Sequence, residues 1–157
     1  MIGALEGHSR ARDVRARLVE LHPRNCELAL AGAPAGVEVL CGDASLTSSY
    51  AGAVPADIVL ANGVFGNISD AHIVRTVETL PSLCAPGATV IWTRHRREPD
   101  ITPDIRRWFE AAGFAEVAFE GPEGFIFGVG VNRLTKPPEP FRESKMFEFV
   151  GSDQNWE

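Results

Sequence analysis

Short apolar runs alternate with segments of helical periodicity along most of the chain. Continuous runs such as residues 56–61 are typical of strands that are covered on both faces, as in parallel sheets. Between the runs, apolar residues recur at helical spacing, and Ser69 and Thr102-Pro103 are typical helix starts. We expect strands at residues 13–21, 37–41, 56–61, 88–93, 115–120 and 125–134, helices at residues 24–33, 69–80 and 102–112, and a brief helical turn at residues 45–52.

The order of these elements predicts the fold class. Strands and helices alternate up to residue 112, which predicts an α/β fold with a mostly parallel, doubly wound sheet and helices on both faces. The turn at residues 121–124 is too short for a parallel crossover, so the last two strands form a C-terminal antiparallel hairpin. We expect one α/β domain at residues 1–136. Residues 137–157 form a Pro-rich linker and tail, in which residues 146–150 are an edge strand or a docked segment.

Composition narrows the class of protein. A chain of 157 residues with 45% apolar and 23% charged residues suits one globular domain, and its formal charge of −6 argues against nucleic-acid binding. No apolar stretch approaches the ~18–20 residues that span a bilayer, and the first residues do not form a secretory signal. Cys26, Cys41 and Cys84 are widely spaced and lack nearby histidine partners, so we expect reduced thiols, no metal site and a cytoplasmic location.

Four segments, taken in order, resemble the class I S-adenosylmethionine-dependent methyltransferases. They are VELHP at residues 19–23, CGDAS at 41–45, ADIVLANGVFGNISD at 56–70 and LPSLCAPGATVIWT at 80–93. No single segment is diagnostic, but their order and spacing extend the likeness over most of the chain. The resemblance implies a doubly wound sheet whose last strand is antiparallel, S-adenosylmethionine as the cofactor, and methyl transfer to a small-molecule acceptor.

The resemblance also implies cofactor-binding roles for residues at strand ends, where ligands of open α/β sheets bind. Glu20 would accept the ribose hydroxyls and Asp43 the adenine amino group, with Ala44 as a backbone contact. Asn62 and Gly63 would lie nearest the methionine moiety, where a glycine lets the backbone approach a ligand closely. The plainer interpretation is that these are solvated strand-end acids and turn residues.

Candidates for binding the methyl acceptor also lie at or just after strand ends. Phe65 either walls the substrate pocket or anchors its loop to the core, and Asn67 is a substrate contact or a turn residue. Arg94 would hold an acidic acceptor, and His95 is the one histidine at a predicted strand tip. An imidazole there suits a general base that removes the acceptor's proton, whereas the alternative is a solvated basic turn.

One part of the family pattern is missing. The resemblance implies a first strand and a glycine-rich loop roughly 17–25 residues before Glu20, which places them at or before Met1. Residues 1–6 resemble the end of a helix instead, so we expect an N-terminally truncated fold with a central gap on the order of 5 Å, one strand's width. The flanking strands would then close together, or residues 146–150 or a second chain would fill the gap. The fourth alternative is that the sequence is a truncated product or has a misplaced start.

Three functions stay open from the sequence. The first is a methyltransferase with a small-molecule acceptor, whose activity is in question because the glycine-rich loop is missing. The second is a non-catalytic remnant that acts as an assembly or partner-binding module, including a homo-oligomer that completes the sheet. The third is a nicotinamide-dependent reductase fragment, which Glu20 supports and the terminal hairpin opposes.

Overall fold

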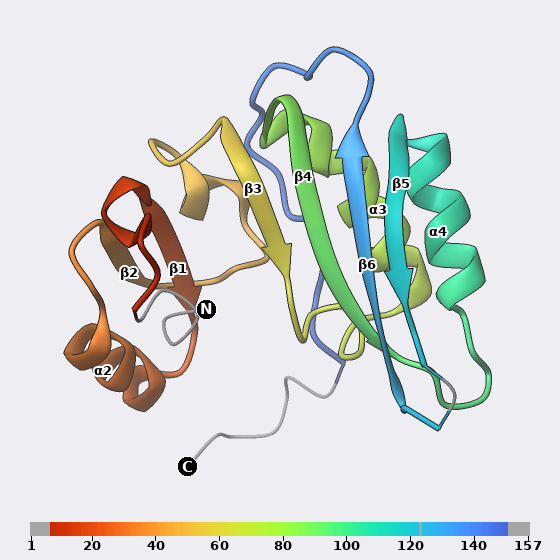
Figure 1. Cartoon of the computed structure of the whole chain (residues 1–157), viewed down its shortest axis with the longest axis horizontal. Coiled ribbons are helices and arrows are strands. Elements are labelled where there is room, and N and C mark those ends of the chain that lie inside the picture. The colour runs from red at the N-terminus through yellow and green to blue at the C-terminus, as the bar shows by residue number, and fades with distance from the viewer. Residues whose placement is uncertain (1–6, 123, 151–157) are drawn as a thin grey trace.

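Two sheets form the framework of the protein. The computed structural model describes residues 7–122 and 124–150, and the expectation for residues 1–6 lies outside that part. The strands, in chain order, are β1 (Ala16–Glu20), β2 (Val37–Cys41), β3 (Ala56–Ala61), β4 (Cys84–His95), β5 (Phe114–Glu120) and β6 (Phe127–Leu134). β1 and β2 form a two-stranded parallel sheet, and the others form a four-stranded sheet in the order β3-β4-β6-β5. The smaller sheet lies beyond β3 (Figure 1).

The helices connect the parallel strands. They are α2 (Pro23–Gly32), α3 (Asp70–Thr79) and α4 (Thr102–Ala111), with short 3-10 turns η1 (Ala11–Asp13), η2 (Thr47–Tyr50) and η3 (Leu80–Ser82). Ser69 caps α3 as its sequence predicts, because the Ser69 hydroxyl accepts a hydrogen bond from the His72 N–H. α3 and α4 both lie on the same face of the four-stranded sheet (Figure 1).

The mixed α/β fold and the terminal hairpin are confirmed. β3 and β4 are parallel, whereas β6 is antiparallel to both of its neighbours, β4 and β5. The strand expected at residues 88–93 is longer in the structure, because β4 begins at Cys84 and includes Pro86-Gly87, which the sequence pattern suggested as a turn. Gly87 takes a φ of 71°, and the register with β3 shifts there, so the strand continues through an irregularity.

The ladder between the two sheets is broken. In the described part of the chain, β1 pairs with β2 alone and β3 pairs with β4 alone. The flanking strands therefore do not close on each other, and residues 146–150 do not fill the gap. Both of those expectations are wrong. Residues 146–150 do not enter the gap, because the apolar side chains of Met146 and Phe147 are buried in the hydrophobic core and are each only 3% exposed.

Residues 142–150, which we call the C-terminal strap, dock along the loops instead. The Thr47 hydroxyl donates to the Arg142 carbonyl (2.8 Å) and accepts from the Ser144 N–H (2.7 Å). Met146 N–H then donates to Ser45 O, and Val150 N–H donates to Asn67 O, each at 2.8 Å. The strap therefore joins the loop after β2 to the loop after β3.

The cysteines also differ from expectation. Cys26 of α2 and Cys41 of β2 form a disulfide pair with Cα atoms 5.8 Å apart, so the expectation of three reduced thiols is wrong for these two. They are 15 residues apart in sequence, and packing of α2 beside β2 brings them together. Cys84 is free and buried.

The core centres on Trp92 of β4. Its fully buried ring lies 6.0 Å from the Phe65 ring and stacks 5.8 Å from the Phe109 ring, measured between centroids. Its Nε1 donates to the buried Asn132 Oδ1 at 2.8 Å. Gly130 of β6 lies directly opposite Trp92, and a Cβ atom there would overlap the indole ring. The absence of a side chain at Gly130 therefore makes room for the central aromatic residue.

We predict that Gly130→Ala lowers the free energy of unfolding by about 3 kcal/mol or more, because the added methyl group must displace a fully packed indole. Gly32→Ala is the matched control, since no atom lies within 4 Å of the Cβ it would add. Urea unfolding followed by tryptophan fluorescence measures both variants. Equal stability of the two would contradict the packing described for Trp92.

Candidate functional site

The tips of β1 and β2 hold two neighbouring carboxylates. Gly42 N–H donates to Glu20 O at 2.9 Å, which continues the ladder to the end of both strands. Glu20 Oε1 accepts from His22 N–H (2.9 Å), and Asp43 Oδ1 accepts from Ser45 N–H (2.8 Å). Each carboxylate thus uses one oxygen to hold its own turn. Within the described residues the other oxygen has no hydrogen bond, so two acceptors are available at this tip.

The backbone around Asp43 is held firmly. Its carbonyl accepts from the Ser49 hydroxyl at 2.7 Å, and the Tyr50 hydroxyl donates to the Ala44 carbonyl at 2.8 Å. Burial, and then the neighbouring Asp43 carboxylate, raise the pKa of Tyr50 to about 12. The phenol therefore stays protonated and keeps its donor role. Because the Ala44 carbonyl is engaged within the chain, its N–H is the backbone group left for a ligand.

A second group forms where the loop after β3 meets the end of β4. Gly63 N–H donates to Thr93 Oγ1 (3.1 Å), and Asn67 Nδ2 donates to Gly63 O (2.6 Å). Arg94 Nη1 donates to Phe65 O. The Phe65 ring is fully buried in the aromatic core, which is the position of a loop anchor. The polar atoms of the loop are thereby fixed at the surface, with Asn62 exposed.

His95 ends β4 in an electropositive setting. Burial, followed by the charges of Arg94 and Arg97, lowers the pKa of His95 below its ordinary value of 6.5. The loop runs against the imidazole, since a Cβ atom on Gly66 would lie 3.6 Å from His95 Cδ2. The imidazole is therefore neutral near pH 7 and able to accept a proton.

Buried side-chain polar atoms without a hydrogen-bond partner lie near strand ends in both sheets. Among the described residues they are His22 Nδ1, Ser45 Oγ, Arg94 Nε and His95 Nδ1. All four lie at or just beyond the carboxyl ends of parallel strands β1, β2 and β4. Most buried polar atoms in native proteins have a partner, so this edge has unused hydrogen-bonding capacity. Sequence reasoning missed His22 and Ser45, although each lies two residues after a strand-end acid.

The two groups of site residues face the same edge of the molecule. β1 and β3 both run toward the lower edge in Figure 1, which places their carboxyl ends together there. Glu20, Asp43 and Ala44 belong to the group on the smaller sheet. The group on the larger sheet consists of Asn62, Gly63, Asn67, Arg94 and His95. The break in the ladder separates the two groups, and the C-terminal strap connects their loops.

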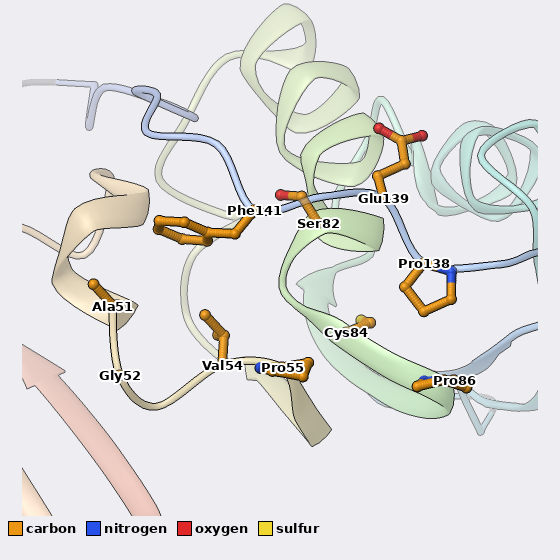
Figure 2. A pocket seen from close by; sticks show the side chains of 10 residues that line it. All are labelled: Ala51, Gly52, Val54, Pro55, Ser82, Cys84, Pro86, Pro138, Glu139 and Phe141. Atoms are coloured by element: carbon orange, nitrogen blue, oxygen red, sulfur yellow. The ribbon is translucent and has the colours of Figure 1, made fainter.

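A recess of about 340 Å³ lies at the opposite edge, around the starts of β3 and β4. Val54, Pro55 and Phe141 give it a largely apolar lining (Figure 2). Burial raises the pKa of the Cys84 thiol there to about 11, so the thiol stays protonated. None of the cofactor-binding or acceptor-binding candidates from the sequence lines this recess.

Within residues 7–122 and 124–150, no group of three or more His, Cys, Asp or Glu side chains is arranged to hold a metal ion. None of the helices in that part of the chain combines the length and the apolar character needed to cross a bilayer.

Comparison with known proteins supports the fold. No protein-family model and no curated protein matches the sequence. Among solved structures, the N-methyltransferase NodS from Bradyrhizobium japonicum WM9 in complex with S-adenosyl-L-homocysteine matches with a TM-score of 0.60 and 14% identity, over 78% of this chain and 67% of that one. The 1,6-didemethyltoxoflavin-N1-methyltransferase of Burkholderia thailandensis has a TM-score of 0.57 and 16% identity, over 78% and 62% of the two chains.

A methyltransferase from Pyrococcus furiosus is similar as well, with a TM-score of 0.56 and 12% identity over 83% of this chain and 67% of that one. The chain spans about half (55%) of an O-methyltransferase family protein from Burkholderia thailandensis. At these identities the likeness concerns the fold, which is the Rossmann-like fold of S-adenosylmethionine-dependent methyltransferases. Residues 53–157 make up about two thirds of the chain, so matches of 78% or more also take in part of the region with the smaller sheet.

We predict that an NMR titration of the His95 imidazole gives a midpoint below pH 6.5. Arg97→Gln removes one of the nearby positive charges from an exposed position, so the midpoint should move up toward 6.5. Arg75→Gln, on α3, serves as the control and should leave the midpoint in place. A midpoint at or above 6.5 in the unaltered protein would contradict the environment described for His95.

Proposed function

We propose that this chain binds S-adenosylmethionine at the carboxyl edge of its parallel strands and transfers the methyl group to a small-molecule acceptor. The observation that carries the proposal is the gathering of unpartnered polar atoms at that edge, from His22 and Ser45 on one side to Arg94 and His95 on the other. The methyltransferase fold adds support, because ligands of open α/β sheets bind at this edge.

The residues at the tips of β1 and β2 fit the adenosyl half of the cofactor. The free oxygen of Glu20 would accept the ribose hydroxyls, and the free oxygen of Asp43 would accept the adenine amino group. Ala44 N–H would contact the adenine ring, and Ser45 Oγ adds a hydroxyl that lacks a partner within the described residues. S-adenosylmethionine, when bound, supplies a methyl group on a positively charged sulfur.

The loop after β3 and the end of β4 would position the methionine end and the acceptor. Asn62 and Gly63 lie where β3 ends, and Asn67 holds this loop closed through its bond to Gly63. The neutral His95 would take the acceptor's proton at its unpartnered Nδ1, while Arg94 and Arg97 favour an acceptor with negative charge. Phe65 supports this geometry from the core rather than from the pocket.

We predict that Glu20→Ala and Asp43→Ala each weaken binding of S-adenosylhomocysteine by about 1–3 kcal/mol, the scale of a charge-assisted hydrogen bond. Isothermal titration calorimetry measures the affinity. Glu27→Ala, at an exposed position on α2, is the control and should leave the affinity unchanged. Unchanged affinity in both site variants would show that the adenosyl group does not bind at the tips of β1 and β2.

The second candidate is a non-catalytic module that binds a partner or assembles with copies of itself. It is favoured by the broken ladder, which leaves one edge of β1 and one edge of β3 unpaired within the described residues. Static light scattering and the same calorimetry separate the two functions. A well-behaved monomer that binds the cofactor supports the enzyme, whereas a larger species with no cofactor binding at about 1 mM supports the module.

A further inference from the structure

A cysteine pair lies beside the two carboxylates at the tips of β1 and β2. Cys41 is the residue of β2 that pairs with Glu20 of β1, and it comes two residues before Asp43. The Cys26 sulfur lies 3.3 Å from the Glu20 carbonyl oxygen. The Cα atoms of the two cysteines are 5.8 Å apart, which is a usual separation for a disulfide. The disulfide therefore joins the two segments that hold both acids.

Apolar packing contributes little to this part of the molecule. In the described part of the chain, no residue within 16–41 belongs to the hydrophobic core, and Cys26 is the one residue of α2 that is buried. Leu28 and Leu30 of the same helix are 67% and 57% exposed. A segment without an apolar core depends on covalent links for its stability. The disulfide is therefore the strongest link between α2 and β2 among the described residues.

The two cysteines differ in accessibility. Cys26 is 2% exposed, whereas Cys41 occupies an exposed position at the end of β2. A thiolate from solvent therefore reaches Cys41 and not Cys26. The Cys26 thiol that forms on reduction has an acceptor already in place, because its sulfur is within hydrogen-bond distance of Glu20 O. Both the disulfide and the dithiol form thus have a defined partner for the buried sulfur.

We propose that the Cys26–Cys41 pair is a redox switch that sets the order of the tips of β1 and β2 and thereby the affinity for the cofactor. In the disulfide form, α2 is fixed to β2 and the two acids are held in place. In the dithiol form, α2 is released and the tips loosen. The effect on affinity rests on the proposed function, whereas the change in order at the tips does not.

The switching step is thiol–disulfide exchange with a small dithiol. One thiolate of the dithiol attacks Cys41 Sγ, which breaks the bond to Cys26 and forms a mixed disulfide, and the Cys26 thiolate takes up a proton. The second thiolate of the dithiol then closes on its own first sulfur and releases Cys41, which is protonated in turn. The protein disulfide gains two electrons and two protons, and the dithiol loses them as it becomes a disulfide.

Loosening of the tips lowers the affinity because the binding residues must then be ordered when the cofactor binds. Two amides mark the ordered state, since Gly42 N–H donates to Glu20 O and Ser45 N–H donates to Asp43 Oδ1. A form in which these bonds are mostly open has its affinity reduced by the fraction of molecules in which they are closed. Reduction should therefore weaken both the bonds and the affinity.

The first test contains no cofactor. The full chain is treated with oxidised or with reduced dithiothreitol, and mass spectrometry after alkylation in denaturant counts the free cysteines. We expect only Cys84 to be free in the oxidised form and all three cysteines in the reduced form. Amide exchange at Gly42 and Ser45 should be at least about tenfold faster after reduction, whereas Thr135, which bonds to Gly113 beside the larger sheet, should change by less than about twofold.

The second test measures the affinity of both forms for S-adenosylhomocysteine by isothermal titration calorimetry. The oxidised form should bind at least about tenfold more tightly than the reduced form, because its tips are already ordered. Reoxidation of the reduced protein should restore the original affinity, which separates the switch from irreversible damage.

Two single variants assign the effect to this pair. Cys41→Ser, at an exposed position, removes the bond and should behave as the reduced form under both conditions. Cys84→Ala removes the remaining thiol and should keep the full redox response, since Cys84 lines the recess at the opposite edge. Circular dichroism checks that both variants fold.

The results separate the switch from the proposed function. Free thiols at Cys26 and Cys41 after oxidation, or equal exchange at Gly42 and Ser45 in both forms, would overturn the switch. A reduced form that binds as tightly as the oxidised form would overturn it as well. Absence of binding in both forms, together with the expected change in exchange, would overturn cofactor binding at this edge and support the switch in the order of the strand tips.

Discussion

Packing around Trp92 is the interaction on which the rest of the larger sheet depends. The indole needs the space that Gly130 leaves, and its N–H needs the buried oxygen of Asn132. The same ring packs against Phe65, which fixes the loop after β3 against the end of β4. One buried aromatic residue thus determines where the polar atoms of Gly63, Arg94 and His95 are held. The core and this half of the candidate site are parts of one packing arrangement.

The other half of the site is connected by different means. In a continuous sheet a backbone ladder would hold β1 beside β3, but here the connection is made by Arg17 and the C-terminal strap. The Arg17 guanidinium also pairs with Glu38 at 2.8 Å, which ties β2 into the same contact. A few hydrogen bonds to partly exposed groups restrain the two sheets less than a continuous backbone ladder would. The alignment of the two halves of the site therefore depends on Arg17 and the C-terminal strap.

Polar side-chain atoms without a partner among the described residues lie at the carboxyl ends of the parallel strands. Strand ends release the backbone from pairing, so turns there are held by side chains such as Glu20 and Asp43. Each acid keeps one oxygen free within the described residues, and His22 and Ser45 add buried atoms without partners there. The apolar recess at the opposite edge has no comparable set of polar groups, although it is a well-defined hollow. Polar groups, more than volume, distinguish the two edges.

Local patterns in the sequence determined the order of strands and helices, the start of α3 at Ser69 and the antiparallel hairpin, because periodicity and capping depend on residues close in the chain. They also marked Glu20, Asp43 and His95 as strand-end groups. Only the tertiary structure decided the pairing of Cys26 with Cys41, the docking of the strap, and the choice of Phe65 as a core anchor. These depend on partners distant in sequence. The open ladder between β1 and β3 belongs with them, since which strands pair is settled by the space and backbone groups that remain after the core has packed.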